Sequence, residues 1–503
     1  MNCFNCDSDN VIKNGKSVST QKIKQRYLCK DCGSHFSFAF DVEPDENPRN
    51  IIHSKNRRYI ITSAQNAAQV HTGFLTAILS YASNNNASLM VIPVPYRKSQ
   101  DDCDESYDEQ LEPYLCQSNL VLAEQQVQIL GSLKISPTTE NPLSGLDSIC
   151  SGVTTIIAHP QVQLRTLPSL DRNVAILTTT GSVTVPEYNK TKTGQKAQLN
   201  HTLAAVVLEV SDTEFHIRHL NWSEQSQSFY DIDRQYHSDG SISNSLHCEA
   251  LITGDEHCIF RDPGVEYQTY LAADSIVNTL KPRYIVRHDV LDSYAISHHH
   301  RNNLFTQYAK WRTGMNCIET EVRKTIDYIN KTTPEFSQSI IIQSNHNEHL
   351  LRWLNEVDIR TEPWNAKVYH FLMYNLLERC EMNDSGTTFP DPFAFLAAHL
   401  VNPNVVFANR GWLTILGIEV GQHGDRGING ARGSSRSFAR LPVRTVVGHS
   451  HSPSIEKGCY TVGTSSLLQM EYNSGASTWK HAHVIIHPNA ERQMIFITMN
   501  GWH

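Results

Sequence analysis

The fold of this chain can be argued from one stretch, Arg444-Thr445-Val446-Val447-Gly448-His449-Ser450-His451. The short β-branched run at its start predicts a buried strand. Gly448 ends the run, and a turn just past the strand end can aim the rings of His449 and His451 at one point. Neutral imidazole is a common ligand for transition metals. Because a lone His-x-His pair more often has a purely structural explanation, a metal site requires further ligands elsewhere in the chain.

Four further apolar runs lie upstream, and each ends in Asp, Asn or His. In an open α/β sheet, ligands bind beyond the carboxyl ends of the strands. Helical patterns separate several of the runs, so the C-terminal half is predicted to be an α/β domain with polar side chains gathered at one edge. The four runs are residues 249–254 before Asp255 and His257, 283–287 before His288 and Asp289, 339–344 before Asn345 and His346, and 415–422 before His423.

This series of Asp-x-His, Asp-x-x-Asp, Asn-His, His and Gly-His-x-His resembles the motifs of the calcineurin-like metallophosphoesterase superfamily in residue types, order and strand context. The resemblance covers about the C-terminal half, residues 246–503, and implies an α/β sandwich with two divalent metals that share Asp289. It implies that one metal is held by Asp255, His257, Asp289 and His451, and the other by Asp289, Asn345, His423 and His449.

The same resemblance gives roles to residues beside the ligands. His346 is expected to steady or protonate the leaving oxygen, and His288 and Asp292 are expected to orient ligands. Two departures from the family pattern are visible, since His288 and Ser344 stand where the family usually has Gly. A mixed nitrogen and oxygen ligand set is compatible with Mn²⁺, Fe, Ni²⁺ or Zn²⁺, and Mn²⁺ is the usual assumption for a nuclease of this superfamily.

Four cysteines near the N-terminus form two Cys-x-x-Cys pairs, Cys3 with Cys6 and Cys29 with Cys32. Each pair can present two thiolates to one tetrahedral Zn²⁺, and so short a segment would take much of its folding energy from the metal. Residues 1–40 are therefore predicted to be a small zinc ribbon, with chance clustering of the cysteines as the alternative. The pattern Lys-Asn-Gly at residues 13–15, followed by Gln-Arg-Tyr-x-Cys-Lys-x-Cys at residues 25–32, resembles the zinc ribbons at the front of many transposases. Those ribbons are associated with DNA or protein contact.

Residues 51–222 are predicted to form a second α/β domain, because a strand, a helix and further strands follow one another. We find no convincing catalytic set there, so this part could position the substrate, mediate assembly or brace the C-terminal half. The expected strands lie at residues 59–64, 88–94, 154–158, 174–178 and 203–210.

A loop between His423 and the Gly-His-x-His motif interleaves four arginines with Gly and Ser. Guanidinium groups match phosphate geometry and Gly lets a backbone approach closely, so phosphate contact is favoured over the alternative of a solvated loop. The triplet His298-His299-His300 is interpreted as surface or substrate rim, because three consecutive residues cannot share one face. The apolar runs 483–486 and 494–497 are predicted to complete a second sheet packed on the first. The four arginines are Arg426, Arg432, Arg436 and Arg440.

Composition places the chain among globular proteins: 503 residues, 19% charged and 40% hydrophobic, with a formal net charge of −8. This length predicts two or three domains. No apolar run approaches the ~20 residues needed to span a bilayer, and no signal-peptide core opens the chain, so we expect a cytoplasmic protein without membrane contact. The negative net charge confines any nucleic-acid contact to local basic patches or to the metals.

These features predict a metal-dependent DNase that hydrolyses phosphodiester bonds with a metal-activated hydroxide. The whole set, ribbon included, is similar to phage-encoded pre-early proteins that degrade host DNA, which implies action in the host cytoplasm. One alternative is a phosphatase or phosphodiesterase that acts on a small or protein-bound phosphate. Another is a DNA- or protein-binding regulator on a retained scaffold. The sequence leaves open whether the chain forms homo-oligomers or binds other proteins through the ribbon or through residues 51–222.

Overall fold

A computed structural model describes residues 2–3, 5–19, 22–41, 50–51, 58–96, 106–122, 126–150, 152–169, 174–211, 214–382, 391–409, 411–470, 473, 475–498 and 500–502. The chain divides into two compact units, Met1–Ile52 and His53–His503. Its architecture is mixed α/β, as the sequence predicts. Among the described residues, no helix combines the length and the apolarity needed to cross a membrane.

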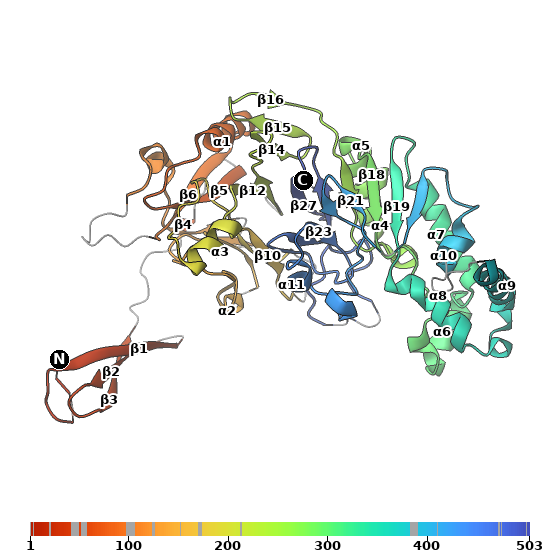
Figure 1. The fold of residues 1–503 in the computed structure, drawn as a ribbon, viewed down its shortest axis with the longest axis horizontal. Coiled ribbons are helices and arrows are strands. Elements are labelled where there is room, and N and C mark those ends of the chain that lie inside the picture. The colour runs from red at the N-terminus through yellow and green to blue at the C-terminus, as the bar shows by residue number, and fades with distance from the viewer. Residues whose placement is uncertain are drawn as a thin grey trace. The chain divides into compact units, whose positions relative to one another are not determined.

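The first unit contains an antiparallel sheet of three strands, β1 (Val11–Ser19), β2 (Lys22–Cys29) and β3 (His35–Asp41), with β2 in the middle (Figure 1). Cys3 and Cys29 are buried. Among the described residues of this unit no helix covers the sheet. Small sheets of this kind hide little apolar surface and are usually stabilised by a cross-link or a metal.

The second unit contains a six-stranded sheet in the order β20-β19-β18-β17-β26-β27. Its first four strands run parallel, and β26 pairs antiparallel with β17, with Ala250 opposite Ile486. The prediction that residues 483–486 and 494–497 complete a second sheet is therefore wrong, because they extend the sheet that contains β17. The strands are β17 (Ala250–Ile252), β18 (Tyr284–Arg287), β19 (Gln338–Ile342), β20 (Val405–Ala408), β26 (Ala482–Ile486) and β27 (Arg492–Phe496).

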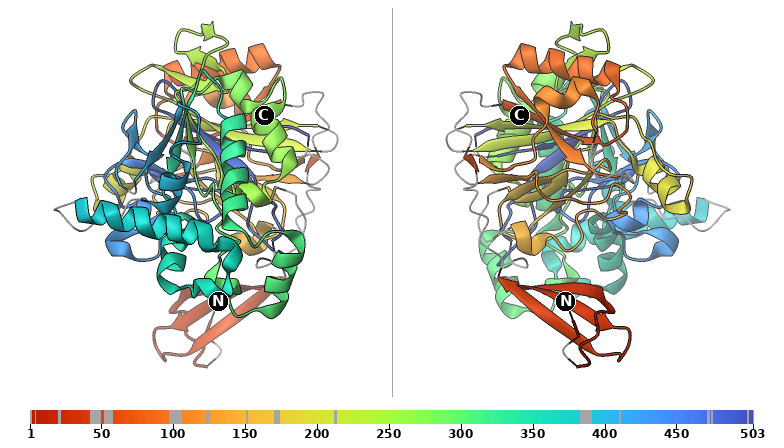
Figure 2. Two further views of the ribbon diagram at one scale, coloured as in Figure 1. Left: turned by 90° about the vertical axis from the view of Figure 1, so that its right-hand side faces the viewer. Right: turned by 90° about the vertical axis from the view of Figure 1, so that its left-hand side faces the viewer.

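Alternate residues of this sheet face two different cores, as the two-residue period of a strand requires. Ile252, Val286 and Ile340 join a core that the sheets share. Leu251 and Ile285 face the opposite way, into a core beneath helices. Figure 2, left, shows these helices in front of the sheet. The helices are α5 (Ile276–Leu280), α7 (Ile318–Lys331), α8 (Asn345–Glu356), α9 (Ala366–Met382) and α10 (Pro392–Ala397).

The shared core also contains Val446, Ile455 and Tyr460 from a second, large sheet. Ten described strands of this large sheet belong to the second unit, in the order β21-β22-β23-β25-β24-β10-β11-β9-β8-β7. The predicted α/β domain at residues 51–222 and the predicted C-terminal domain at residues 246–503 thus contribute strands to one sheet, joined where β10 pairs with β24. The strands are β7 (Asn119–Leu122), β8 (Val127–Leu130), β9 (Thr154–Ile157), β10 (Gln163–Thr166), β11 (Ile176–Thr179), β21 (Thr414–Ile415), β22 (Ile418–Glu419), β23 (Arg444–Val447), β24 (Ser454–Glu456) and β25 (Cys459–Thr461).

A four-stranded sheet completes the second unit's framework, in the order β13-β12-β5-β6. The strand, helix and strand predicted near its start are confirmed. Ile61 and Val206 of this sheet join the shared core, whereas Ile60 and Val207 face the core beneath α1. The elements are β5 (Arg58–Gln65), α1 (Thr72–Asn85), β6 (Ser88–Val94), β12 (Ala204–Val210) and β13 (Phe215–Asn221).

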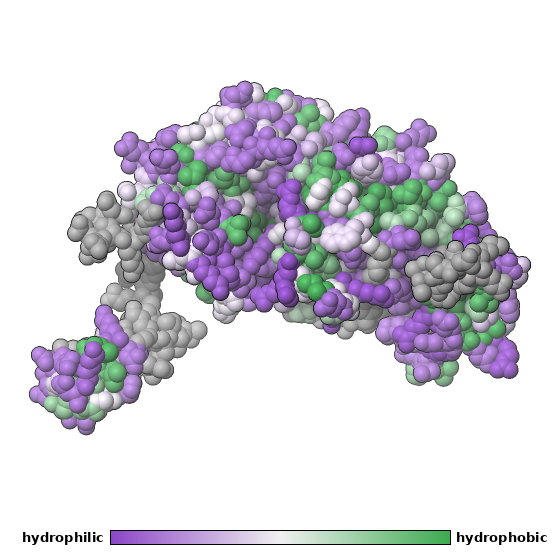
Figure 3. All heavy atoms as spheres, viewed as in Figure 1, coloured by the Kyte–Doolittle hydropathy of each residue, from purple (hydrophilic) through white to green (hydrophobic). Residues whose placement is uncertain are grey.

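Hydrophilic residues cover most of the face drawn in Figure 3, and hydrophobic residues gather near β18 and β21. Beside β21, Trp412 is 65% exposed and Leu416 is 44% exposed. β21 is the last strand at its end of the large sheet and is only two residues long. A short edge strand offers few free backbone groups, which limits pairing with another chain despite the exposed apolar side chains.

A buried ion-pair network ties β12 and β13 to β14 (Ser228–Asp231). Arg218 is 4% exposed, and its guanidinium donates to Asp231 at 2.5 and 2.7 Å and also contacts Glu209. The Tyr81 hydroxyl donates to Asp231 at 2.9 Å. Burial alone would raise the pKa of Asp231, but the charge of Arg218 outweighs it and lowers the pKa. Asp231 is therefore an ionised carboxylate that compensates a buried cation.

Asp231→Asn should lower the free energy of unfolding at pH 7 by about 3 kcal/mol, because the buried Arg218 charge loses its main partner. Since the folded-state pKa of Asp231 is lowered, its contribution is present above the unfolded pKa and is lost as pH falls through the folded pKa. In denaturant titrations the difference between wild type and variant should therefore shrink below about pH 4. Asp327→Asn, at an exposed carboxylate on α7, should change stability by less than about 0.5 kcal/mol; equal losses in both variants would contradict the network's role.

Candidate metal centre

The ends of strands from two sheets bring the predicted ligands together. β17, β18 and β19 run parallel, so their carboxyl ends lie at one edge. Asp255 and His257 follow β17, and Asp289 follows β18. From the large sheet, His423 follows β22 and His449 follows β23. The cluster therefore exists only where the two sheets meet over their shared core.

The ligand atoms form two groups, each with all its atoms within 4.8 Å of one another, and Asp289 belongs to both. His451 Nε2 lies 3.0 Å from Asp255 Oδ2 and 3.0 Å from His257 Nε2. In the other group, His423 Nε2 lies 3.0 Å from Asp289 Oδ2. Six of the seven predicted ligands are thus brought together, as Asp255, His257, Asp289 and His451, and as Asp289, His423 and His449.

Unpartnered buried atoms at this edge fit a metal. Oδ1 of Asp255 and Oδ1 of Asp289 are buried and have no hydrogen-bond partner among the described residues. The same holds for Oδ1 of Asn345, the seventh predicted ligand, which begins α8 directly after β19. Buried polar oxygens without a partner are costly, and a divalent cation would satisfy them. The donor set of carboxylate, amide and imidazole suits a transition metal.

The backbone at the cluster is strained. Four predicted ligands have positive φ values: 40° at His257, 45° at Asp289, 72° at His449 and 56° at His451. Residues other than glycine rarely adopt this region, and each such residue costs about 1–3 kcal/mol. Strain of this kind persists where the surrounding structure holds it, and it gathers at functional sites. Its concentration here favours a binding function for this edge.

Gly448 allows β23 to approach a ligand from the other sheet. A Cβ atom at this position would lie 2.3 Å from Asp255 Oδ1 and 3.1 Å from the ring of His288. The next residue, His449, donates its backbone N–H to Asp255 Oδ2 at 2.8 Å. Only glycine leaves room for this arrangement, which explains why the apolar run of β23 ends at this residue.

Burial and neighbouring charges set the protonation of the groups in the cluster. Burial alone would raise the pKa of Asp289, but the charges of His423 and His346 outweigh it and lower the pKa well below its usual value. Burial lowers the pKa of His451, so its ring is neutral at pH 7. Burial would also lower the pKa of His257, but the neighbouring carboxylate of Asp292 raises it to about 9. Metal binding must therefore displace a proton from His257.

The two residues predicted to orient ligands do contact them. Asp292 Oδ1 accepts the Nδ1–H of His257 at 2.8 Å, which leaves His257 Nε2 for a metal. His288 Nδ1 lies 3.5 Å from His423 Nδ1. Burial lowers the pKa of His288 to about 4, so this ring is neutral. The two contacts restrict the ring orientations of one ligand in each group.

Two buried residues beside the ligands were not predicted from the sequence. Arg287 and Glu256 are both 0% exposed, and Arg287 Nη1 lies 3.1 Å from Glu256 Oε2. Arg287 also donates to the Ser339 hydroxyl at 3.1 Å and to the Thr332 carbonyl at 2.8 Å. Because Glu256 stands between two ligands in the sequence and Arg287 ends β18, the pair ties together the loops after β17 and β18. A charged residue at the end of an apolar strand is the signal that points to such a pair.

His346 lies beside the ligands, at the start of α8. Its Nδ1 lies 2.8 Å from the carbonyl oxygen of Asp292, and its ring centroid lies 5.0 Å from that of His257. The ring of His349 is 5.0 Å from that of His346, and the ring of His298 is 5.0 Å from that of His349. The first residue of the histidine triplet thus lies at the end of a row of imidazoles that starts at a metal ligand.

All four arginines of the predicted phosphate-binding loop are exposed. Arg426 pairs with Glu348 of α8 at 2.6 Å. Within the described part of the chain, Arg432, Arg436 and Arg440 make no ion pair. Three guanidinium groups are therefore available to an anionic ligand close in sequence to His423, and the fourth would have to leave its carboxylate partner first.

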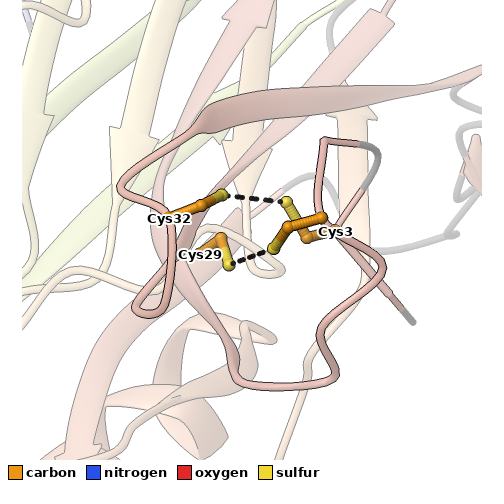
Figure 4. A group of neighbouring side chains, drawn as sticks. Cys3, Cys29 and Cys32 are labelled. Carbon is orange, nitrogen blue, oxygen red and sulfur yellow. Dashed lines mark hydrogen bonds between the residues drawn. The ribbon is translucent and has the colours of Figure 1, made fainter.

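The four cysteines of the first unit converge as well, and Figure 4 shows two pairs of sulfur atoms in contact. Cys3 Sγ lies 3.5 Å from Cys32 Sγ, and Cys6 Sγ lies 3.6 Å from Cys29 Sγ. In both turns the N–H that follows the second cysteine donates to the carbonyl of the first, at 2.9 and 3.0 Å. Hydrogen bonds with Ser34 lower the pKa of Cys32 to about 6. Four thiols in this arrangement fit one tetrahedral Zn²⁺.

Gly448→Ala should weaken Mn²⁺ binding at least about tenfold, because displaced supporting groups around a metal cost 10–100-fold in affinity. The added Cβ must push Asp255 or β23 aside, while the rest of the fold is untouched. Isothermal titration with Mn²⁺ measures the affinity. Gly458→Ala is the matched control, since a Cβ there first meets another atom at 3.9 Å. Unchanged affinity in folded Gly448→Ala would show that Asp255 is not a ligand.

Cys29→Ser should release the Zn²⁺ of the first unit and make residues 1–40 sensitive to protease, because the ribbon loses one of four ligands. The second unit is compact in its own right, so its Mn²⁺ affinity should stay at the wild-type value. Zinc analysis, limited proteolysis and Mn²⁺ titration report the three quantities. Cys116→Ser, outside the cluster, should keep its zinc. Joint loss of zinc and of Mn²⁺ binding in Cys29→Ser would show that the predicted boundary is wrong.

Comparison with known proteins relates the chain to a phage protein. No family model and no solved structure matches it. The chain is 30% identical over 458 residues to protein A1 of Escherichia phage T5, an alignment that covers 88% of this chain and 82% of that protein. Identity at this level over nearly the whole length indicates common descent, and a phage origin fits it. The chain therefore belongs to the family of phage T5 protein A1.

Proposed function

We propose that this protein is a metal-dependent DNase that hydrolyses phosphodiester bonds at the candidate metal centre. One observation carries the proposal: two groups of ligand atoms share the buried carboxylate of Asp289. A shared carboxylate suits two divalent ions ~3.5–4 Å apart, the spacing of two-metal sites that act at phosphorus. The proposed metals are two Mn²⁺ at this centre and one Zn²⁺ in the ribbon, in line with the donor atoms of each site.

The proposed fold of residues 246–503 is the metallophosphoesterase sandwich. Two features support this fold. β17 to β20 are parallel with helices on their outer face, and the ligands come from loops of two sheets over a shared core. A ribbon at residues 1–40 and an accessory part at residues 51–222 complete the proposed organisation.

The residues of the chain have distinct roles in the proposed reaction. Two divalent metals, when bound, supply polarisation of the phosphoryl group and activation of water. Asp292 holds the His257 ring by its Nδ1–H. His346 donates its own Nδ1–H to the Asp292 carbonyl, which leaves Nε2 to protonate or steady the leaving oxygen. The buried pair of Arg287 and Glu256 keeps the loops rigid, so the site needs little reorganisation.

DNA is proposed as the substrate because exposed guanidinium groups follow the candidate ligand His423 in a chain of negative net charge. The formal net charge is −8, yet Arg432, Arg436 and Arg440 are exposed in the loop after His423. Guanidinium groups bind phosphate oxygens bidentately. The zinc ribbon offers a second place of contact. A phage origin fits the chain, and for a phage protein the proposed substrate is host DNA in the host cytoplasm.

Asp289→Asn should slow DNA cleavage at least about a hundredfold, because loss of a supporting group near a metal already costs 10–100-fold. Asparagine keeps the shape of the side chain and tolerates a positive φ. Purified protein is incubated with duplex DNA, with single-stranded DNA and with an aryl phosphodiester, each with and without Mn²⁺. Asp327→Asn, at an exposed carboxylate on α7, should cleave at the wild-type rate.

Each outcome of this assay assigns a function. DNA cleavage that needs both Mn²⁺ and Asp289 supports the DNase. Turnover of the aryl ester with DNA left intact would replace it with a phosphatase or phosphodiesterase for a small or protein-bound phosphate. Binding of DNA without turnover of either substrate would indicate a DNA-binding regulator on the same scaffold.

A further inference from the structure

The ten strands of the large sheet in the second unit are arranged symmetrically about the centre of the sheet. Outward from the centre, one side runs β24, β25, β23, β22, β21 and the other runs β10, β11, β9, β8, β7. On both sides the successive pairs are antiparallel, parallel, parallel and antiparallel. The chain also visits the five strands of each side in the same order. Two segments of this chain therefore form the same half-sheet.

The pairing at the centre of this sheet has twofold symmetry. In the neighbouring strand, Leu164 pairs with Thr178, which lies three residues before Gly181. Ile455 pairs with Tyr460, which lies three residues before Gly463. Leu164 and Ile455 therefore occupy equivalent positions in β10 and β24. These two equivalent residues face each other across the β10–β24 junction. An interface in which equivalent residues meet is the mark of a twofold axis. The flanking pairs obey the same rule, with Gln163 opposite Glu456 and Arg165 opposite Ser454.

The other sheet of each half matches as well. β5 and β6 are parallel, as β17 and β18 are. β12 pairs antiparallel with β5, as β26 does with β17. β13 then adds beyond β12, as β27 adds beyond β26. Ile61 of β5 and Ile252 of β17 both face the shared core. Residues 58–221 and 250–496 thus contain one common framework of two sheets.

A side-chain motif repeats at equivalent places after β11 and β25. Ser182 Oγ donates to the Ser63 carbonyl at 3.1 Å and accepts the N–H of Thr184 at 3.2 Å. Thr464 Oγ1 makes the same two bonds, to the Asp255 carbonyl at 2.9 Å and from the N–H two residues ahead at 3.0 Å. The two copies therefore agree both in the order of their strands and in individual hydrogen bonds.

The first copy nevertheless lacks the carboxylate ligands. Asp255 and His257 follow β17, whereas residues 63–66 at the end of β5 read Ser-Ala-Gln-Asn. β18 leads into Asp289, whereas residues 92–94 at the end of β6 read Ile-Pro-Val. None of these counterparts is an acid or an imidazole, so the first copy cannot hold a shared carboxylate.

His159 is the histidine of residues 58–221 that stands at the position equivalent to the ligand His449, and its ring is satisfied within the core. His159 and Gln161 follow β9 where His449 and His451 follow β23. His159 Nε2 lies 3.2 Å from the Ser136 carbonyl, and its Nδ1 accepts the N–H of Gln161 at 3.0 Å. Both ring nitrogens are therefore used, which leaves neither for a metal.

We infer that residues 58–221, the first copy, are a metal-free version of the framework that holds the metal centre, and that this copy is the built-in partner of strand β24. The twofold axis passes between Leu164 and Ile455. A free sheet edge tends to pair with another chain, and here the equivalent edge of the same chain occupies it, as in a dimer of identical subunits. The metal-free character is defined relative to the proposed metal centre and rests on that proposal, whereas the twofold relation does not.

A crystal structure of the full-length protein grown with Mn²⁺, with anomalous diffraction measured at the manganese edge, tests both parts. A rotation of about 180° should superpose β7–β11 on β21–β25, and manganese should lie at Asp289 and not beside His159. A rotation far from this value would overturn the twofold relation. Manganese beside His159 would overturn the metal-free copy. Absence of manganese at both places, with the superposition intact, would refute the proposed function and leave the duplication standing.

Manganese content of full-length variants gives a second readout in solution. His159→Gln should keep the wild-type ratio of manganese to protein, because this ring is a core residue. His449→Gln, at the equivalent position of the metal centre, should lose about half of the manganese, since one of two ions loses a ligand. Thermal melting confirms that each variant is folded. Loss of manganese from folded His159→Gln would overturn the inference.

Discussion

The carboxylate of Asp289 is the point on which the rest of the structure depends. It belongs to both groups of ligand atoms, so loops from two separate sheets must be held within a few ångströms of it. The buried carboxylates of Asp255 and Asp289 belong to one group of ligand atoms that lie within 4.8 Å of one another. At this distance two carboxylates repel each other unless positive charge lies close by. His423, 3.0 Å away, supplies part of that charge, and divalent ions would supply the rest. The arrangement is therefore one that could hold metal ions.

A stiff framework is needed to hold this arrangement. The left-handed backbone at the ligands costs about 1–3 kcal/mol for each residue concerned, and packing elsewhere must outweigh that cost. One core joins the inner faces of three sheets, and the buried pair of Arg287 and Glu256 fixes two of the loops. The metal-free copy, residues 58–221, extends the large sheet beyond β24. The copy that carries the ligands therefore has no free sheet edge at β24.

Local patterns predicted the strands of the site well but not their partners. A strand buried on both faces reads as an apolar run, and each run before Asp255, Asp289 or His449 is a strand. The prediction for β26 and β27 names the wrong sheet, because an apolar run in a sequence does not indicate which strand it pairs with. Arg287 and Glu256 escaped notice because they are 31 residues apart. The internal repeat is not visible in the sequence, because the two copies share strand pairing and packing but have few identical side chains at equivalent positions.

The sequence by itself determined which residues can bind metal and in what order they occur: four cysteines near the N-terminus, and Asp, Asn and His at the ends of apolar runs. Only the tertiary structure decided that six of these ligands converge, that Asp289 belongs to both groups, and that Leu164 faces Ile455 on a twofold axis. The physical reason is that such distances are set by the pairing and packing of strands hundreds of residues apart, for which a single sequence carries no local signal.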